Sequence, residues 1–219
     1  MSQSAPAIVW FREDLRLSDN PALHAAVSSG RPLVLLYILD EQTKGLRPLG
    51  GASKWWLDKS LRALAADIKQ AGAQLTLRSG QSADVLDTVI EETGAETIFW
   101  NRRYDQPERD LDAAIKEDLA QRGLDVSSYN ARLLNEPWQV ETNAGGYYKV
   151  FTPYWRAARN NFVARDTYGR HKTLSGPKPE SESLDDWGLH PSNPDWSTGF
   201  DDWTPGEDGA IARLNDFLD

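Results

Sequence analysis

Short apolar runs alternate with amphipathic segments along the first 130 residues. Each run has four to seven residues, and several are rich in β-branched or aromatic side chains, which favours buried strands. The predicted strands are Ala7–Phe11, Leu33–Leu39, Gln74–Leu77, Thr97–Trp100 and Val126–Tyr129. Between them, apolar side chains recur at the spacing of an amphipathic helix. The predicted helices run from the cap Asn20 to Gly30, over about Ser53–Gln70, over Ser82–Thr93 and over about Pro107–Arg122.

Repeated strand–helix alternation predicts an α/β fold: a doubly wound, Rossmann-like, five-stranded parallel sheet with helices on both faces. Ligands of such folds bind beyond the carboxyl ends of the strands, near the point where strand order reverses. We therefore expect any site to be built from the loops that follow the strands. These loops are Arg12–Asn20, Asp40–Gly51, Arg78–Gln81, Arg102–Gln106 and Asn130–Glu136.

The alternation decays after about Leu133. A short strand and a helix are predicted within Tyr147–Phe162, and residues 165–206 are rich in Pro, Gly, Ser and Asp, which favours a long irregular linker on the surface. Glu207–Leu218 regains helical spacing. The sequence therefore predicts an α/β domain over residues 1–132, a linker over 133–206 and, over 207–219, the start of a further, truncated domain.

Composition narrows the class of protein. The chain has 219 residues and no Cys, so it can form neither a disulfide nor a thiolate metal site. No apolar run approaches the roughly 20 residues that a membrane helix needs. The segment Met1–Pro6 lacks the basic and apolar regions of a secretion signal, and a cytoplasmic location is expected.

Charge is unevenly distributed. Residues 180–219 hold eleven acidic residues and one basic residue, whereas residues 1–179 hold 22 acidic and 23 basic residues. Neither part has the basic excess of a free-standing nucleic-acid binder. The segment Tyr154–Lys172 is locally basic, as a solvated helix face or a phosphate-binding surface would be. Of nine Trp residues, three lie in the acidic region, and we expect them to pack rather than stay disordered: Trp187, Trp196 and Trp203.

The common catalytic patterns are missing from the sequence. It has no GxGxxG, GxxxxGK[ST], GxSxG or HExxH pattern, which argues against dinucleotide-binding, P-loop, hydrolase and zincin functions. The three His residues, His24, His171 and His190, are scattered, and no metal site is expected.

The run Ile8–Asn20, IVWFREDLRLSDN, joins a buried strand to a capped helix. In the loop between them, Arg12 and Arg16 are expected to pair with Asp14 and Asp19. The run resembles the opening signature of the photolyase/cryptochrome family. Further matches follow in the family's order, so the resemblance spans nearly the whole chain. They are Gly51–Leu57 (GASKWWL), Thr97–Arg102, Tyr148–Arg156 (YKVFTPYWR) and Trp203–Glu207 (WTPGE).

The resemblance implies the N-terminal antenna domain of a deoxyribodipyrimidine photo-lyase, which repairs UV-damaged DNA by light-driven electron transfer from FAD. Residues 207–219 would then begin the helical FAD-binding domain, and this fragment alone would not be catalytic. A cryptochrome photoreceptor is the first alternative. The second is a stand-alone nucleotide-binding module of the universal-stress type, which predicts a Gly-rich phosphate loop that this sequence lacks.

The resemblance also suggests an antenna pigment. In folate-containing relatives an Asn-Glu pair opens the helix after the fourth strand; here Glu108 matches the Glu, and Pro107 replaces the Asn. The Pro-Tyr-Gly-Arg run of deazaflavin-binding relatives is missing, so methenyltetrahydrofolate is favoured over 8-hydroxydeazaflavin. An acid in the first turn of a helix is the alternative role of Glu108.

Three further residues are candidates for the pigment site. Adjacent helical residues point about 100° apart, so at most one of Trp55 and Trp56 should face a pigment. Trp56 fits the apolar stripe of its helix, which makes Trp55 the better candidate, although packing could account for both. Lys54 and Arg12 are possible polar contacts for the pigment. Tyr148–Arg159 is expected to contact the missing C-terminal helical domain.

Overall fold

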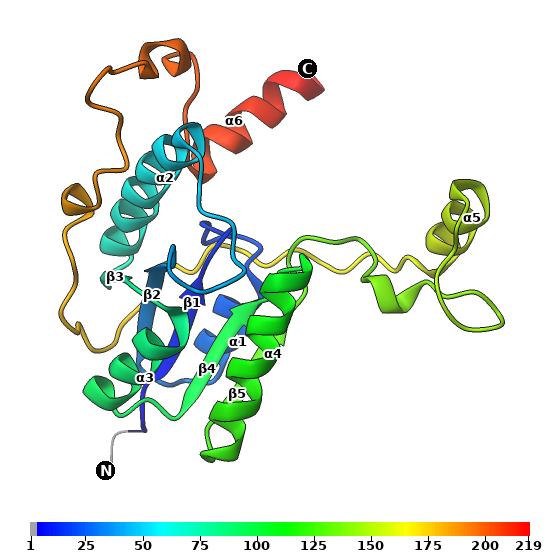
Figure 1. Cartoon of the computed structure of the whole chain (residues 1–219), viewed down its shortest axis with the longest axis horizontal. Helices are drawn as coiled ribbons and strands as arrows, with labels where there is room; N and C mark the ends of the chain where they lie inside the picture. The colour runs from blue at the N-terminus through cyan, green and yellow to red at the C-terminus, as the bar shows by residue number, and fades with distance from the viewer. Residues whose placement is uncertain (1–3) are drawn as a thin grey trace.

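The computed structural model describes residues 4–219 and contains one five-stranded parallel sheet in the order β3-β2-β1-β4-β5 (Figure 1). The strands are β1 (Ala7–Phe11), β2 (Leu33–Leu39), β3 (Leu75–Ser79), β4 (Thr97–Asn101) and β5 (Asp125–Tyr129). Neighbouring strands pair in parallel register, for example Val9 with Leu35 and with Phe99. The predicted doubly wound α/β fold is confirmed.

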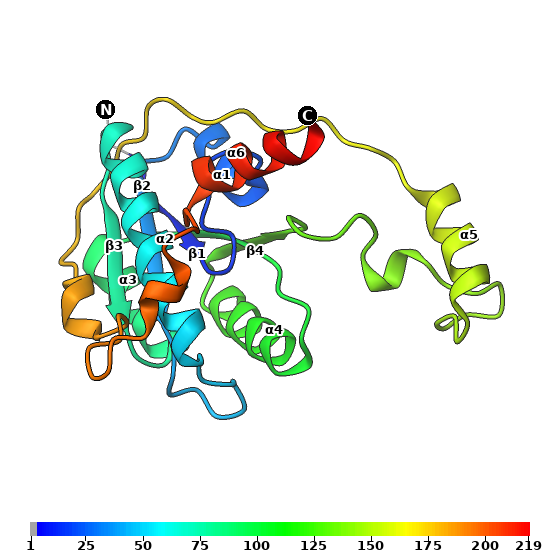
Figure 2. The same ribbon diagram turned by 90° about the horizontal axis from the view of Figure 1, so that it is seen from above.

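Helices cover both faces of the sheet, with α1 and α4 on opposite sides (Figure 2). Their bounds are α1 (Pro21–Ser28), α2 (Gly51–Gln70), α3 (Ser82–Thr93) and α4 (Gln106–Gln121). Side chains along a strand alternate between the two faces of the sheet, so β1 contributes residues to two separate hydrophobic cores. Val9 and Phe11 pack with α1 and α2, whereas Ile8 and Trp10 pack with α3 and α4.

The helix ends follow local chemistry. The Leu23 N–H donates to Asn20 Oδ1 at 3.1 Å, so Asn20 caps α1 as predicted, with Pro21 at the first helical position. Gly94 ends α3 at φ 65°, a left-handed conformation that glycine adopts without steric cost. Strand order reverses between β1 and β4, so the loops that follow these two strands diverge and leave room for a ligand.

Residues 133–164, which we call the arm, project from the sheet in both views (Figures 1 and 2). The arm contains a short helical turn, η1 (Pro137–Gln139), and the helix α5 (Phe151–Asn161). The short strand predicted before this helix is wrong, because Tyr147–Val150 is irregular and finds no neighbouring strand with which to pair. Within the arm, Asn135 Nδ2 donates to the Ala158 carbonyl at 3.3 Å, so the arm is folded on itself.

Residues 165–206, which we call the strap, lie along the domain and contain the turns η2 (Leu184–Trp187) and η3 (Ser197–Phe200). The Leu33 N–H donates to the Ser175 carbonyl at 2.8 Å, and the Glu182 N–H donates to the Leu77 carbonyl at 2.9 Å. Leu174 and Leu189 are buried in the core under α1 and α2. The core therefore extends past residue 132, and the three-part division of the chain stays a prediction.

The chain ends in α6 (Glu207–Leu218), which lies beside α2. The locally basic segment that precedes it is partly neutralised, because Arg165 pairs with Asp19 at 2.6 Å and Arg170 pairs with Glu207 at 3.0 Å. This favours a structural role for these two arginines. Within residues 4–219 no helix combines the length and apolar character that crossing a membrane requires.

Candidate functional site

A cavity of about 1340 Å³ opens at the carboxyl ends of the strands, where strand order reverses. Its walls come from the loop after β1, the end of β2 and the loop after it, the starts of α2 and α4, and one face of α6. Three of the five loops predicted to build a site meet here, those after β1, β2 and β4, and α6 closes the remaining side. The loops Arg78–Gln81 and Asn130–Glu136 contribute no residue to the lining.

One side of the cavity is apolar and aromatic. Tyr37 at the end of β2 and Trp56 on α2 present rings to it, and Ile211 and Leu214 contribute aliphatic surface from α6. A cavity of this size with aromatic and aliphatic surface on one side can take a planar organic ligand, and the charged and polar side chains of its loops can orient such a ligand.

Arg12 supplies a charged group at the cavity and is only 6% exposed. Its guanidinium lies 4.5 Å from the centre of the Trp10 ring, donates to the Asn101 carbonyl and pairs with Asp112 Oδ1 at 2.6 Å. Burial lowers the pKa of Arg12, and the charge of Asp112 offsets part of that shift. The expected ion pairs of Arg12 and Arg16 with Asp14 and Asp19 do not form among the described residues. Asp14 accepts from the Arg12 backbone N–H at 2.8 Å, and the Arg16 guanidinium donates to the Ser18 and Asp19 carbonyls at 3.2 and 2.9 Å.

Glu108 lies in the first turn of α4 and lines the same cavity. Arg103 bridges two acids, with its Nη1 3.2 Å from Glu108 Oε1 and its Nη2 3.2 Å from Asp112 Oδ1. Burial raises the pKa of Glu108 above its usual value, and the positive charge of Arg103 opposes the shift. A half-buried carboxyl beside one guanidinium can hold a hydrogen-bonding ring edge, because it keeps acceptor capacity free.

The structure brings together two of the four predicted site residues, Arg12 and Glu108, and leaves the other two outside the cavity lining. Lys54 Nζ pairs with Glu41 at 2.7 Å. Trp55 is 5% exposed, and its ring stacks on Phe200 of the strap at 5.0 Å. No contact in the structure tests the binding role of these residues directly.

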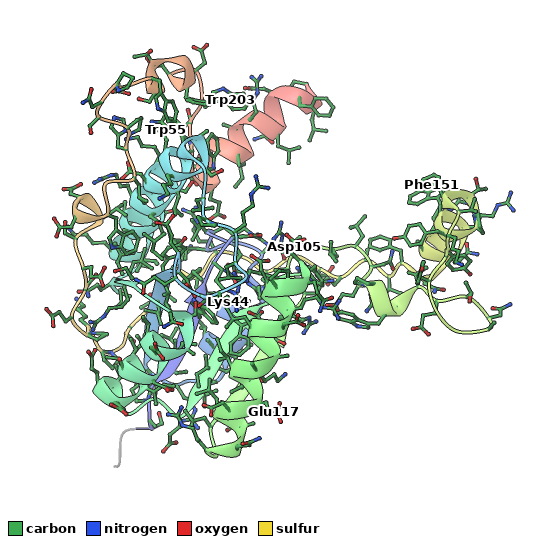
Figure 3. All side chains as sticks on the ribbon, viewed as in Figure 1. Lys44, Trp55, Asp105, Glu117, Phe151 and Trp203 are labelled. Carbon is green, nitrogen blue, oxygen red and sulfur yellow. The ribbon has the colours of Figure 1, made fainter. Side chains whose placement is uncertain are left out.

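The expected orientations of the two tryptophans are wrong. Trp56, predicted to be core, is 41% exposed and faces the cavity, whereas Trp55 is buried. The apolar stripe of α2 predicts only which side chains face the sheet. In the structure the strap also packs over the N-terminal end of this helix, so side chains outside the stripe can be buried there. Trp55 and Trp203 lie near the same end of α2 (Figure 3). The Trp203 ring lies edge-on to the Trp56 ring, with 6.3 Å between the ring centres. The strap thus adds further aromatic rings around Trp55 and Trp56.

Sequence reasoning missed three contributors to the cavity. Arg103 follows β4 inside a loop that was expected to carry the site, so its position was a usable signal. Tyr37 was counted only as part of a buried strand. The wall from Ile211 and Leu214 had no signal, because it depends on how a helix at the end of the chain folds back.

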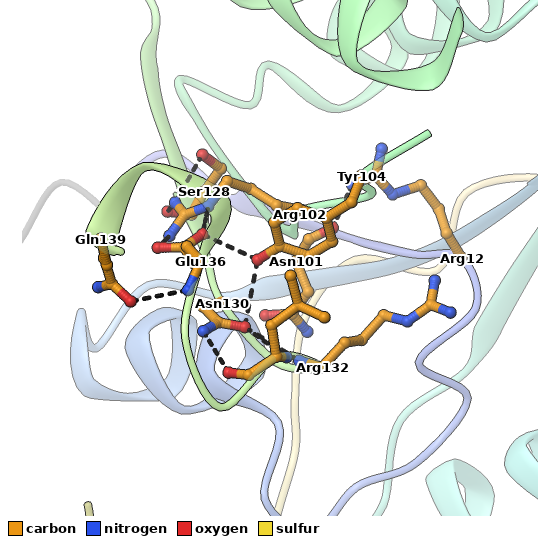
Figure 4. Close-up of polar contacts among 10 residues, drawn as sticks. Arg12, Asn101, Arg102, Tyr104, Ser128, Asn130, Arg132, Glu136 and Gln139 are labelled. Carbon is orange, nitrogen blue, oxygen red and sulfur yellow. Dashed lines mark hydrogen bonds and ion pairs between the residues drawn. The ribbon is translucent and has the colours of Figure 1, made fainter. Parts of the chain in front are cut away.

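A second polar cluster fixes the base of the arm (Figure 4). Arg102 binds both carboxylate oxygens of the buried Glu136, at 2.7 and 3.0 Å, and the Tyr104 hydroxyl donates to Glu136 at 2.8 Å. Burial and the Glu136 charge raise the pKa of Tyr104 to about 12. The Glu136 N–H donates to Gln139 at 2.7 Å, which completes a structural junction. Residues 4–219 contain no group of three or more metal-ligating side chains.

The family model described as DNA photolyase matches residues 7–174. The chain belongs to the DNA photolyase family. It is 47% identical to the deoxyribodipyrimidine photo-lyase of Agrobacterium fabrum over 220 aligned positions, which cover 99% of this chain and 45% of that protein. It is 41% identical to Arabidopsis thaliana cryptochrome-1 over 150 positions, covering 68% of this chain and 22% of that protein.

A solved structure shows the same likeness. The crystal structure of a bacterial class III photolyase from Agrobacterium tumefaciens superposes on this chain with a TM-score of 0.93 and 47% identity, covering 100% of this chain and 45% of the other. The chain thus spans less than half the length of the photolyases that it matches. Within this family it corresponds to the N-terminal α/β domain of photolyases and cryptochromes.

Proposed function

We propose that this chain is the antenna-pigment domain of a deoxyribodipyrimidine photo-lyase. The whole protein would repair UV-damaged DNA by light-driven electron transfer from FAD, in the cytoplasm, and residues 1–219 would not catalyse repair by themselves. The observation that carries the proposal is the cavity at the strand-order reversal, in a chain 47% identical to a photolyase over nearly its whole length. Photolyases and cryptochromes bind FAD and an antenna chromophore.

The cavity can do what an antenna domain requires. A bound pigment supplies light absorption, and the protein has to hold it in one orientation and keep water from its faces. Trp56 and Tyr37 offer rings for stacking, and Ile211 and Leu214 add aliphatic surface to the same apolar side of the cavity. The pair Arg103–Glu108 gives the site one fixed polar edge.

We favour methenyltetrahydrofolate over 8-hydroxydeazaflavin as the pigment. Glu108, the acid that matches folate-containing relatives, lies in the cavity wall with its carboxyl beside Arg103. Arg12 is kept as a site residue, because it lines the same wall and orients Asp112. Trp56 replaces Trp55 as the proposed stacking ring, and Lys54 is left as a residue at the outer edge of the site.

Pigment titration tests this proposal. Methenyltetrahydrofolate added to the purified protein should bind stoichiometrically and shift its near-ultraviolet absorption. We expect Glu108→Ala to weaken binding by at least about tenfold, since a hydrogen bond to a charged group contributes roughly 1.5–3 kcal/mol. Glu117→Ala is the matched control, because Glu117 lies exposed near the other end of α4 (Figure 3). Equal affinity of the two variants would remove Glu108 from the site.

The arm supports a second part of the proposal, namely that it contacts the helical FAD-binding domain of the whole protein. The arm carries several large apolar side chains that are exposed to solvent, and exposed apolar patches mark interaction surfaces. These side chains include Leu134, Tyr147, Val150, Phe151, Trp155 and Val163. We expect the arm to become protected from proteases in the full-length protein and to be cleaved first in residues 1–219.

A cryptochrome photoreceptor remains the second candidate function, because the chain is 41% identical to cryptochrome-1 over 150 positions. The two functions differ in the reaction of the whole protein. Blue-light repair of an oligonucleotide that carries a thymine dimer would support the photolyase. Lack of repair by a flavin-loaded, full-length protein would favour the cryptochrome.

A further inference from the structure

Two walls of the cavity come from opposite ends of the chain. The loop after β1 contributes Arg16, Ser18 and Asp19, and α6 contributes Ala210, Ile211 and Leu214. These walls are about 190 residues apart in sequence, so no local structure sets the distance between them. Something has to hold α6 against the loop if the cavity is to keep its shape.

Glu207, the first residue of α6, makes that connection. Its Oε2 accepts from the Leu17 N–H at 2.8 Å, and its Oε1 accepts from the Ser18 N–H at 3.1 Å. Arg170 of the strap lies 3.0 Å from Oε2, and the Glu207 side chain is only 6% exposed. Both carboxylate oxygens are therefore committed to groups outside α6.

The loop depends on this carboxylate. Leu17 and Ser18 belong to no strand or helix, and Glu207 takes the place of the neighbouring strand that would otherwise accept their N–H groups. Gly206 makes the approach possible. Its φ is +107°, and an added Cβ would lie 2.8 Å from Ala63 Cβ on α2, so only glycine brings the start of α6 this close.

We propose that Glu207 is a positioning residue for the pigment site: it fastens α6 to the loop after β1 and so holds two walls of the cavity at the separation that the pigment requires. This inference rests on the proposed antenna function. Hydrogen bonds from two backbone amides and a guanidinium outweigh the effect of burial and lower the pKa of Glu207, so the carboxylate stays charged at neutral pH.

The neighbouring residue Asp208 makes it possible to distinguish the positioning role of Glu207 from a general electrostatic effect. It too lies in the first turn of α6, and it lies 2.9 Å from the same Arg170. Helix-dipole and ion-pair effects are thus shared by both acids. Only Glu207 binds the Leu17 and Ser18 amides, so Asp208→Ala is a matched control for Glu207→Ala.

The experiment measures amide exchange and pigment binding on the same proteins. By NMR, the Leu17 and Ser18 amides should exchange at least tenfold faster in Glu207→Ala than in the wild type, and at the wild-type rate in Asp208→Ala. Well below the unfolding temperature, Glu207→Ala should bind methenyltetrahydrofolate at least tenfold more weakly, chiefly through faster release. Asp208→Ala should stay within twofold. Glu207→Gln should recover part of the affinity, because its amide oxygen can accept from one of the two N–H groups.

Each outcome decides a separate point. Protected Leu17 and Ser18 amides in Glu207→Ala would overturn the proposed connection. Free exchange of these amides with unchanged pigment affinity would overturn the positioning role. If the wild-type protein bound no pigment, the antenna function itself would be refuted, and the exchange rates would still show whether Glu207 holds the loop.

Discussion

The arm and the strap form one continuous linker in sequence, yet they behave differently in the fold. The strap places Leu174, 2% exposed, in the core and hydrogen-bonds to the start of β2 and to the edge strand β3. The arm leaves Leu134 76% exposed and stands apart from the domain (Figure 1). Both are irregular over most of their length. The contrast shows that the sequence composition of a segment can predict that it lacks helices and strands. The composition says little about whether the segment packs against the domain.

The difference arises from what each segment covers. The outer edge of β3 has backbone N–H groups with no strand beside them, and the strap supplies their acceptors. The Leu77 N–H donates to Ser181 Oγ and the Ser79 N–H donates to Glu182 Oε1, each at 2.9 Å. A free strand edge can pair with the strand edge of another chain, and the strap prevents such pairing at β3. The arm has no such partner among the described residues and joins the domain mainly through Glu136 at its base.

The largest effect should come from truncating a leucine in each segment. Leu174→Ala should lower the free energy of unfolding by about 3 kcal/mol, because it leaves a cavity in the core. Leu134→Ala should change it by less than about 0.5 kcal/mol, as expected for an exposed side chain. Urea denaturation followed by circular dichroism measures both. Similar losses in the two variants would mean that the arm is as firmly bound as the strap.

A somewhat smaller effect should follow from adding one methyl group to the strap. An added Cβ at Gly176 would lie 2.2 Å from the Leu33 carbonyl oxygen, whereas nothing lies within 4 Å of one at Gly169. We expect Gly176→Ala to cost about 2 kcal/mol by forcing the strap away from β2, and Gly169→Ala to be nearly neutral. Thermal unfolding of both variants is the measurement. An unchanged melting temperature for Gly176→Ala would contradict the close contact.

The smallest expected effect is a pH dependence of strap binding. His171 stacks near His24, at 5.5 Å between ring centres, and Tyr168 stacks on His24 at 4.0 Å. Burial and the neighbouring His24 lower the pKa of His171 below the value of about 6.5 that it has when unfolded. The unfolded chain therefore takes up this proton first, so the free energy of unfolding should fall as pH drops through 6.5.

The size of this loss should be under about 1 kcal/mol, since His171 is only partly buried. The free energy of unfolding, measured between pH 7.5 and 5.5, should show this loss in the wild type. The loss should be missing in His171→Asn. A slope that survives in His171→Asn would assign the effect to another group.

The sequence predicted the sheet well because its strands are buried on both faces. The bounds of Ala7–Phe11 and Leu33–Leu39 were predicted to the residue, as was α3, where Gly94 ends the helix. At the other strands the bounds moved by one or two residues. The edge strand β5 is only half-buried and carries a weaker apolar signal, whereas the buried β4 extends to Asn101, a polar residue that the apolar pattern leaves out.

The candidate site was less predictable. Arg12 and Glu108 line the cavity because one follows β1 and the other lies in the first turn of α4, but it was the family resemblance that made them candidates for a pigment site. The exchange of roles between Trp55 and Trp56 could not be foreseen, because it depends on Phe200 of the strap. The bonds from Leu17 and Ser18 to Glu207 join positions about 190 residues apart, and no short-range pattern records them.

Because the strap covers the edge of β3, it also limits where this polypeptide can be shortened. A version that stopped at residue 132 would keep every strand but lose Leu174 and Leu189 from the hydrophobic interior and leave the Leu77 and Ser79 amides bare. Such a piece would tend to associate edge to edge in solution. Gene fusions, crystallisation trials and domain transplants should therefore carry the chain at least through Leu189.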